Sequence, residues 1–385
     1  MRLNSKLTGI IIFITFVLLS CIYEFHLKEG TYENFLVIYG MVTTDNGPYE
    51  VTILKTSTLE NINADSVGSA NVSISDDKGN SILLAEVNTG RYHTPETFTG
   101  QIGTKYKLHI ELQEGKQYES DYVELIDVQG ISELRAEHIT KQATVTTKSQ
   151  EGYQFYINTE PSNIEQKYYK WDVFEDIEFH MPYYIYLYWD GYTITRVDIP
   201  NACYRNSHIN DILIANTDDF QTNYLINFPL NFVSKSRKLQ FGYGITVRQY
   251  ALSEFAYKYW KSAIENSSPD PINSKQLYPV PGNLKCISNP DEPVYGIFEA
   301  SAVKTKSIEV QKLPNEDYEL YICGSNGWIA ELLPQSLLGW HPEPAYIGIP
   351  VGGSTGGWTV VDSKTCVFCE YAGGTAVRPE YWKKY

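Results

Sequence analysis

Between residues 34 and 128 the chain alternates apolar and polar side chains in short runs. At 106–112, for example, Tyr, Leu, Ile and Leu occupy every second position and polar residues fill the gaps. Successive side chains of a strand point to opposite faces, so this pattern predicts strands with one buried face. Turn sequences at 45–48 and 76–80 separate the runs, as in hairpins. We expect an immunoglobulin-like or transthyretin-like sandwich with strands at 35–43, 49–57, 70–75, 81–87 and 105–112.

Residues 129–345 continue the β pattern with longer runs and predict a second, larger sandwich. An Asp-Gly pair at 190–191 separates the aromatic-rich runs 183–189 and 192–199, which predicts a hairpin with a two-residue turn. The Gly- and Pro-rich residues 346–385 are expected to pack on this second domain. The predicted fold class is therefore mainly β, with tandem sandwiches.

One stretch has the period of a helix. Over 253–264, apolar residues recur at 255, 259 and 263, with Ala256 and Trp260 on a neighbouring stripe. Ser253 is a suitable N-cap. We expect an inserted helix that packs against the sandwich; the alternative is a helix that docks on a partner.

The first 20 residues show a different pattern, in which basic Arg2 and Lys6 precede an apolar run at 10–19. These are the parts of a secretory signal peptide, and the run is too short to span a bilayer as a helix. Leu-Leu-Ser directly before Cys21 is typical of bacterial lipoprotein signals. We expect cleavage before Cys21, acylation of that cysteine as a stable membrane anchor, and a tether over 21–33. An ordinary secreted protein is the alternative.

The net charge of the mature chain limits the classes of partner that we expect. Removing residues 1–20 takes two of the 31 basic residues and none of the 46 acidic ones, so the mature net charge is −17. Nucleic acid and anionic lipid headgroups both require basic patches, so neither is an expected partner. The lipid would hold the protein to the membrane. The 31 tyrosines are typical of β proteins with amphipathic contact surfaces.

Five cysteines remain after lipidation, and an exported protein tends to oxidise them. We expect up to two disulfides and one remaining thiol, with the connectivity open, among Cys203, Cys286, Cys323, Cys366 and Cys369. The last two form a C-x-x-C motif. Zinc bound with Cys286 and Cys323, or a redox pair, are the alternatives to structural disulfides. We predict no metal and no other cofactor.

Residues 352–356 match G-x-S-x-G, the turn that presents the nucleophile in many hydrolases. That turn needs a following helix and a later histidine, but 357–361 has the pattern of a strand and the last histidine is His341. We therefore predict no catalytic residues and no enzymatic activity. An unrecognised hydrolase centred on Ser354 remains the alternative.

Tyr184, Tyr186 and Tyr188 should share one face of a strand because they alternate. A row of exposed rings could stack on a glycan or contact a peptide, and would be a candidate site for ligand or partner. We expect instead that the row lies in a contact between sheets or domains.

Four stretches together resemble a family of Bacteroidota surface lipoproteins that is defined by a domain of unknown function. They are Phe-Leu-Val-Ile-Tyr-Gly at 35–40, Leu-Ser-Glu-Phe-Ala-Tyr-Lys-Tyr-Trp at 252–260, Pro-Gly-Asn-Leu-Lys-Cys and the following residues at 281–298, and the C-x-x-C at 366–369 with its continuation to 382. Genes of this family commonly lie beside those of TonB-dependent receptors.

The resemblance implies a lipid-anchored protein of the outer membrane, displayed at the cell surface. It would act as an accessory ligand-capture or docking partner of a TonB-dependent transporter, with a peptide or a glycan as ligand. The alternative is an assembly protein that contacts other envelope proteins. The resemblance supplies no catalytic residues.

Overall fold

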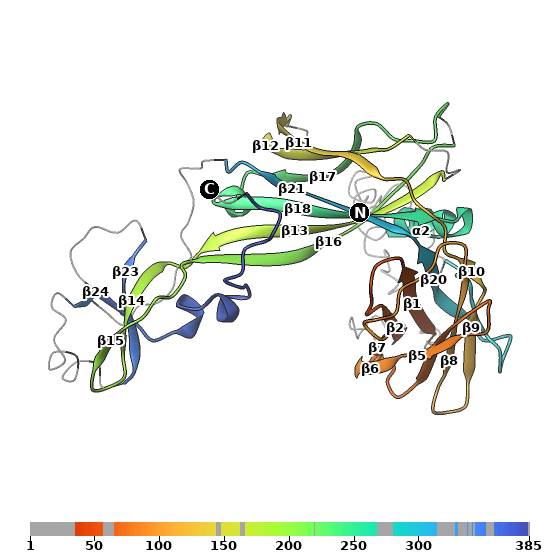
Figure 1. The fold of residues 1–385 in the computed structure, drawn as a ribbon, viewed down its shortest axis with the longest axis horizontal. Coiled ribbons are helices and arrows are strands. Elements are labelled where there is room, and N and C mark those ends of the chain that lie inside the picture. The colour runs from red at the N-terminus through yellow and green to blue at the C-terminus, as the bar shows by residue number, and fades with distance from the viewer. Residues whose placement is uncertain are drawn as a thin grey trace, which may run out of the picture.

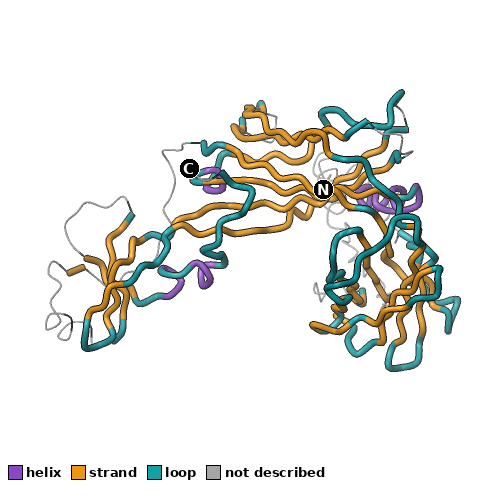
Figure 2. Tube along the Cα trace, in the orientation of Figure 1, coloured by secondary structure: helices purple, strands orange, loops and turns teal. Residues whose placement is uncertain are grey.

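The described residues form five β-sheets and one long helix (Figures 1 and 2). The structure is a computed structural model, and it describes residues 35–56, 65–143, 148–161, 166–218, 220–267, 280–313, 328–329, 337, 341, 343–351 and 358–383. The mainly β fold class with an inserted helix is confirmed. Within these residues no helix is both long and apolar enough to cross a membrane.

The first sandwich consists of two six-stranded sheets. One has the order β20-β1-β2-β7-β6, with β3 on β2; the other has the order β19-β9-β8-β4-β5, with β10 on β8. The first sheet contains β1 (Leu36–Thr43), β2 (Glu50–Lys55), β3 (Asp65–Ser66), β6 (Ala85–Asn88), β7 (Arg91–His93) and β20 (Val294–Ser301). The second contains β4 (Asn71–Asp76), β5 (Ser81–Leu83), β8 (Lys105–Glu111), β9 (Gln117–Ser120), β10 (Val123–Glu124) and β19 (Leu284–Cys286).

Two strands of this sandwich thus come from beyond residue 280, so the predicted boundaries 34–128 leave out part of it. Strand β20 runs parallel to β1, with Leu36 opposite Val294 and Gly40 opposite Phe298. Gly296 has φ +97°, and a Cβ on it would lie 1.9 Å from the Ile38 carbonyl oxygen. Glycine is therefore required where β20 passes β1.

The second sandwich packs a three-stranded sheet on a four-stranded one. The first has the order β11 (Ile131–Lys141), β12 (Gln150–Thr159), β17 (Phe228–Ser234); the second has the order β16 (Ala202–Asn216), β13 (Tyr168–His180), β18 (Gly242–Leu252), β21 (Val303–Val310). Rings from the two sheets meet between them. The Trp171 and Phe228 centroids are 4.6 Å apart, and those of Phe155 and Tyr243 are 6.1 Å apart.

A smaller distal sheet lies beyond the end of the paired strands β13 and β16, at the left of Figure 1. Its order is β15 (Ile194–Arg196), β14 (Tyr183–Trp189), β23 (Ala345–Pro350), β24 (Trp358–Val361), β22 (Trp328–Ile329). The hairpin predicted at 183–199 is therefore present, but it pairs with the C-terminal segment rather than with the second sandwich.

The turn of this hairpin is longer than predicted. Trp189 pairs with Ile194, so the loop has four residues. The Asp190 carboxylate accepts hydrogen bonds from the backbone N–H groups of Tyr192 and Thr193, at 2.8 and 2.6 Å. A side chain that bonds the following backbone in this way stabilises the wider turn.

Helix α2 (Glu254–Ser267) confirms the predicted helix and its cap. The Ser253 hydroxyl accepts a hydrogen bond from the Ala256 N–H at 3.1 Å. Ala256 and Tyr259 are buried, whereas Phe255, which the periodicity places on the buried stripe, is 48% exposed. Three short 3-10 turns complete the described elements: η1 (Arg237–Leu239), η2 (Lys364–Cys366) and η3 (Cys369–Ala372).

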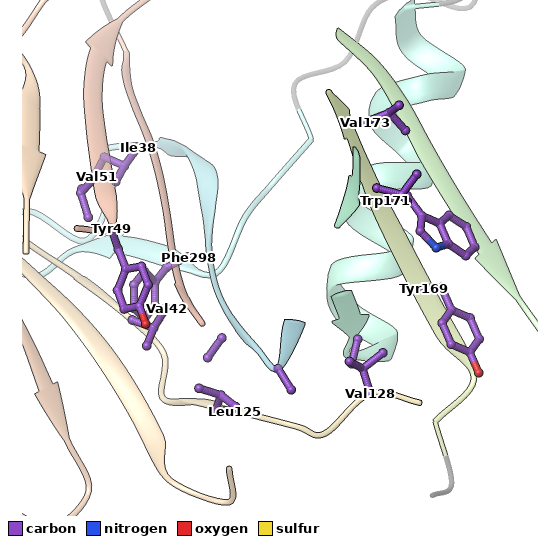
Figure 3. Packing of buried hydrophobic residues seen from close by; sticks show 14 of the residues in the cluster. Ile38, Val42, Tyr49, Val51, Leu125, Val128, Tyr169, Trp171, Val173 and Phe298 are labelled. Atoms are coloured by element: carbon purple, nitrogen blue, oxygen red, sulfur yellow. The ribbon is translucent and has the colours of Figure 1, made fainter. Parts of the chain in front are cut away.

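A single hydrophobic cluster extends through both sandwiches (Figure 3). In the figure, the segment with Leu125 and Val128 runs from the group around Val42 to the group around Tyr169. The distal sheet has separate, small clusters centred on Ile185 and Trp189. The two sandwiches therefore form one packed body, and the distal sheet has its own core.

Candidate functional site

A groove of about 630 Å³ lies where the two sandwiches meet. Strands β1 and β2 of the first sandwich form one wall, and β13, β16 and β18 of the second form the other. Helix α2 and strand β20 contribute Trp260 and Glu299. Both walls belong to sheets whose opposite faces share the continuous core, so the groove is built on a common packed support.

Alternation along two paired strands places charged side chains in the groove. On β13, Tyr169 and Trp171 point into the core, so Lys170 and Asp172 point away from it. In the register with β18, Lys170 is opposite Tyr250 and Asp172 is opposite Arg248. These four side chains form one cross-strand block on the groove wall.

The aromatic part of the groove is a pair of stacked rings. Tyr39 of β1 and Trp260 of α2 lie with centroids 6.5 Å apart and planes inclined by 18°. Tyr39 is 38% exposed, and its hydroxyl is hydrogen-bonded to Tyr259. Burial raises the pKa of the Tyr259 hydroxyl, and the bond to Tyr39 raises it further. The hydrogen bond to Tyr259 therefore fixes the position of the Tyr39 ring, and the stack presents an aromatic face to the groove.

Lys170 and Glu299 form a nearly buried ion pair beside this stack, with 3.5 Å between Nζ and Oε2. Glu299 also accepts a hydrogen bond from the Trp260 Nε1–H at 3.0 Å. The Lys170 ammonium lies 4.5 Å from the Trp260 ring centroid and 5.7 Å from that of Tyr250. Buried charges require this many partners to offset the loss of water, so the cluster is fixed in place.

A second ion pair crosses between the sandwiches. The Arg248 guanidinium donates to the Asp45 carboxylate at 2.8 Å, and both side chains are partly exposed. His208 Nε2 lies 3.9 Å from the Asp172 carboxylate. Burial raises the pKa of the Tyr250 hydroxyl between these groups, and the Asp172 charge raises it further.

The two permanent cations of the groove, Lys170 and Arg248, each have a carboxylate within 4 Å, and the Asp172 carboxylate has the His208 ring at 3.9 Å. Glu50 at the edge is itself paired, 3.2 Å from His93. Among the described residues no cluster of His, Cys, Asp or Glu could hold a metal ion. The groove offers fixed hydrogen-bond donors and acceptors with an aromatic face, an arrangement suited to binding.

A second, more apolar groove of about 510 Å³ lies between β10 and the first turn of α2. Tyr122 and Phe255, both about half exposed, lie along it, and Leu252 and Phe298 are buried beneath. This groove accounts for the exposed Phe255, since the ring lines it instead of the sandwich core.

The predicted tyrosine row lies on the distal sheet, and two of its three rings are partly open to solvent. Tyr184 and Tyr186 are 38% and 40% exposed, which corrects the expectation of a contact between sheets or domains. Tyr188 is half-buried against Tyr346, with 5.1 Å between ring centroids. A bulge between Ile185 and Leu187 shifts the register with β23, so the third ring is not equivalent to the first two.

The cysteines of the C-x-x-C motif do not pair with each other. Cys369 bonds to Cys203, which ties η3 to β16, and Cys366 also belongs to a disulfide. Neither is a free thiol available for zinc or for a redox dithiol. Cys286 forms no disulfide; it is a buried thiol 3.3 Å from the Ser288 hydroxyl. Cys323, like Cys21 and Ser354, lies outside the described residues.

Sequence reasoning did not identify the groove, although a signal for it was present. Three of the stretches that support the family resemblance meet beside it: β1 pairs with β20, and α2 packs on both β20 and β18 through Ile297 and Leu252. The alternation of Lys170 and Asp172 with core residues on β13 was a second signal.

The comparisons with known proteins identify a family without assigning an activity. No curated protein matches the chain. The family described as Domain of unknown function (DUF4249) matches residues 22–307, a range that includes α2, all the groove residues named above and both sandwiches except the last three residues of β21. Because this match extends over well more than half of the sequence, the chain belongs to the DUF4249 family.

Proposed function

We propose that this protein is a non-enzymatic, lipid-anchored binding protein of the outer membrane that captures a ligand for a TonB-dependent transporter. The observation that supports capture is the groove between the sandwiches. Its aromatic stack of Tyr39 and Trp260 lies beside the paired charges of Lys170 and Glu299. Ligand sites combine apolar surface with a few fixed polar groups in this way.

The pairing of the polar groups in the groove favours binding without catalysis. The carboxylates of Glu299 and Asp45 each face a cation, and Glu299 also accepts a hydrogen bond from the Trp260 ring N–H. The Asp172 carboxylate has the His208 ring at 3.9 Å. Groups held in this way can orient a ligand. A catalytic pair would need one group free to take or give a proton.

The sequence supports the two other parts of the proposal, the transporter partner and the lipid anchor. The signal before Cys21 indicates lipidation, and the resemblance to Bacteroidota surface lipoproteins indicates a TonB-dependent partner. A lipid anchor at the start of the first sandwich would hold the groove close to the membrane, where a transporter could receive the ligand.

A second candidate function is docking or assembly with another envelope protein, and the distal sheet favours it. Tyr184 and Tyr186 expose aromatic surface there, and Tyr192 at the hairpin turn is 79% exposed. Tyrosine is enriched at protein interfaces because its ring supplies contact area and its hydroxyl a hydrogen bond.

Copurification tests the proposal. Full-length protein extracted from its native membranes in mild detergent should bring an outer-membrane transporter with it, together with a small ligand detectable by mass spectrometry. Tyr39→Ala should lose the ligand and keep the transporter if the partner contact is the distal sheet, which contains none of the groove residues. A stable transporter complex that contains no ligand, in the wild type, would favour assembly over capture.

The anchor has its own test. Cys21→Ser should leave the protein uncleaved or in the soluble fraction, because lipid is the anchor that the sequence offers. The readout is the membrane fraction after high-speed centrifugation, with Cys286→Ser as the matched control. Membrane attachment of Cys21→Ser equal to wild type would remove the lipid from the proposal.

A further inference from the structure

We infer that the groove between the sandwiches recognises a neutral, hydroxyl-rich ligand, an oligosaccharide, and that it does so through ion pairs that are already complete. This inference rests on the proposed capture function and names the class of ligand for the same groove.

The first step is the charge balance of the groove. An anionic ligand requires a cation without a counter-charge, and a cationic ligand requires a free carboxylate. Lys170 faces Glu299 at 3.5 Å, and Arg248 faces Asp45 at 2.8 Å. An anionic ligand would have to break one of these pairs and leave its carboxylate unsatisfied. A cationic ligand would have to break one of them or compete with the Tyr250 hydroxyl and the His208 ring for the Asp172 carboxylate. A neutral ligand leaves both pairs intact.

The second step is the hydrogen-bonding capacity that remains. A guanidinium has five N–H donors and a carboxylate accepts at about four positions. The 2.8 Å bond joins Arg248 Nη2 to Asp45 Oδ2, and both side chains are partly exposed to the groove. Asp172 and His208 present a further acceptor and ring nitrogen on the same wall. Hydroxyl groups both donate and accept, so neighbouring hydroxyls on one ring fit donors and acceptors held side by side.

The third step is the aromatic face. Tyr39 is 38% exposed while stacked on Trp260, so one face of the pair is supported and part of it is open to solvent. The C–H face of a sugar ring is apolar and can pack flat against such a surface while its hydroxyls reach the polar wall. At about 630 Å³ and open to solvent, the groove has room for more than one sugar ring.

The test uses full-length protein in detergent on three immobilised panels: neutral oligosaccharides of glucose, xylose, mannose and galactose, sulfated oligosaccharides, and mixed peptides. We expect saturable binding to at least one neutral oligosaccharide. Its Kd should change less than about twofold between 50 and 500 mM NaCl, because salt screens ionic attraction and no net ionic contact is made.

Substitutions test whether the oligosaccharide binds in the groove. Tyr39→Ala should weaken it at least tenfold, while Tyr39→Phe, which keeps the ring, should retain most of it. The matched control is Tyr371→Ala on η3, an exposed tyrosine outside the groove, which should bind as wild type. Asp45→Asn discriminates between ligand classes: it frees Arg248, so it should weaken binding of a neutral ligand that Asp45 contacts and strengthen binding of an anion.

Each contrary result has a separate meaning. Binding limited to sulfated oligosaccharides or peptides, and lost in Tyr39→Ala, overturns the ligand class and leaves the capture function standing. Neutral oligosaccharide binding that survives in a folded Tyr39→Ala protein overturns the site. If the protein binds no member of any panel, the inference is overturned. The copurification experiment then tests the capture function separately, by whether a ligand is found with the transporter.

Discussion

The two-sandwich body and the distal sheet are built from similar short strands but are held together differently. In the body, one hydrophobic cluster passes from the first sandwich to the second, and β19 and β20 return from beyond residue 280 to complete the first. The distal sheet has small clusters of its own, and the Cys203–Cys369 bond lies near its junction with β13 and β16. The body depends on shared packing. The distal sheet depends on local packing and on the C-terminal segment that packs against it, which the disulfide links to β16.

The difference suggests a division of tasks. A groove between two sandwiches keeps its shape when both walls belong to one core, and its ion pairs require that precision of placement. A sheet with its own small core can change its exposed residues without disturbing that groove. Ligand capture fits the body, and contact with a protein partner fits the distal sheet.

The largest expected effect comes from comparing two buried tryptophans. Trp171 of the body stacks on Phe228, and Trp189 of the distal sheet donates its ring N–H to the His341 carbonyl at 2.8 Å. Truncating a core tryptophan costs about 3–5 kcal/mol. Trp171→Ala should lower the free energy of unfolding of the whole body by this amount, as measured by urea denaturation.

Trp189→Ala should instead destabilise the distal sheet alone. We expect limited proteolysis to cut within 183–196 while the body keeps its wild-type melting temperature. If Trp189→Ala lowers the stability of the body as much as Trp171→Ala does, the two regions form one cooperative unit and the comparison fails.

The disulfide should give the next largest effect. Cys203 and Cys369 are 166 residues apart, and removing a disulfide that closes a long loop typically costs about 2–4 kcal/mol. The Cys203→Ser, Cys369→Ser double variant should loosen the distal sheet, which faster hydrogen exchange in β14 and β23 would report. Cys286→Ala is the control, since Cys286 forms no disulfide. Unchanged exchange in β14 would show that local packing alone holds this sheet.

Replacing the tyrosine row should have a smaller effect on stability. Exposed positions usually change stability by under about 0.5 kcal/mol each, so Ser at the two exposed positions, 184 and 186, should cost less than about 1 kcal/mol in total. Copurification of the transporter should fall if the distal sheet docks on it, while oligosaccharide binding should not change. A large drop in melting temperature would show that these rings are part of the core.

The smallest expected effect is a pH dependence in the first sandwich. The hydrogen bond from Lys107 lowers the pKa of Glu119 below its ordinary value of 4.5, and His109 contributes in the same direction. A depressed folded-state pKa stabilises the fold above pH 4.5, and this stability is lost as the pH falls through the folded value. For a partly exposed pair we expect about 0.5 kcal/mol. Thermal melts from pH 6 to pH 3 should be less pH-dependent for Glu119→Gln; an identical pH profile would contradict the assignment.

The elements that could be predicted from sequence are those with local patterns. Alternation identified β1, β2, β4 and β8 within a residue or two, and the helical period with Ser253 identified α2. The pairing of β1 with β20 could not be predicted, because a parallel contact between strands so distant in sequence leaves no local pattern. The split of 81–87 into β5 and β6, on different sheets, was missed for the same reason.

The candidate site depended on that distant pairing. The tyrosine row was found because Tyr184 and Tyr186 alternate within one strand, and the structure exposes both. The groove was not found because Tyr39, Lys170 and Trp260 come from three separate segments. Their proximity results from the packing of α2 against β20 of the first sandwich and β18 of the second, which no single run of residues encodes.

Hydrogen exchange with and without bound ligand tests the central claim most directly. The full-length protein would be saturated with the tightest-binding neutral oligosaccharide of the panel and compared with the free protein. The groove assignment predicts slower exchange in β1 and in α2, with no change in β14. Slower exchange confined to β14 and β15 would contradict it and would place the ligand on the distal sheet.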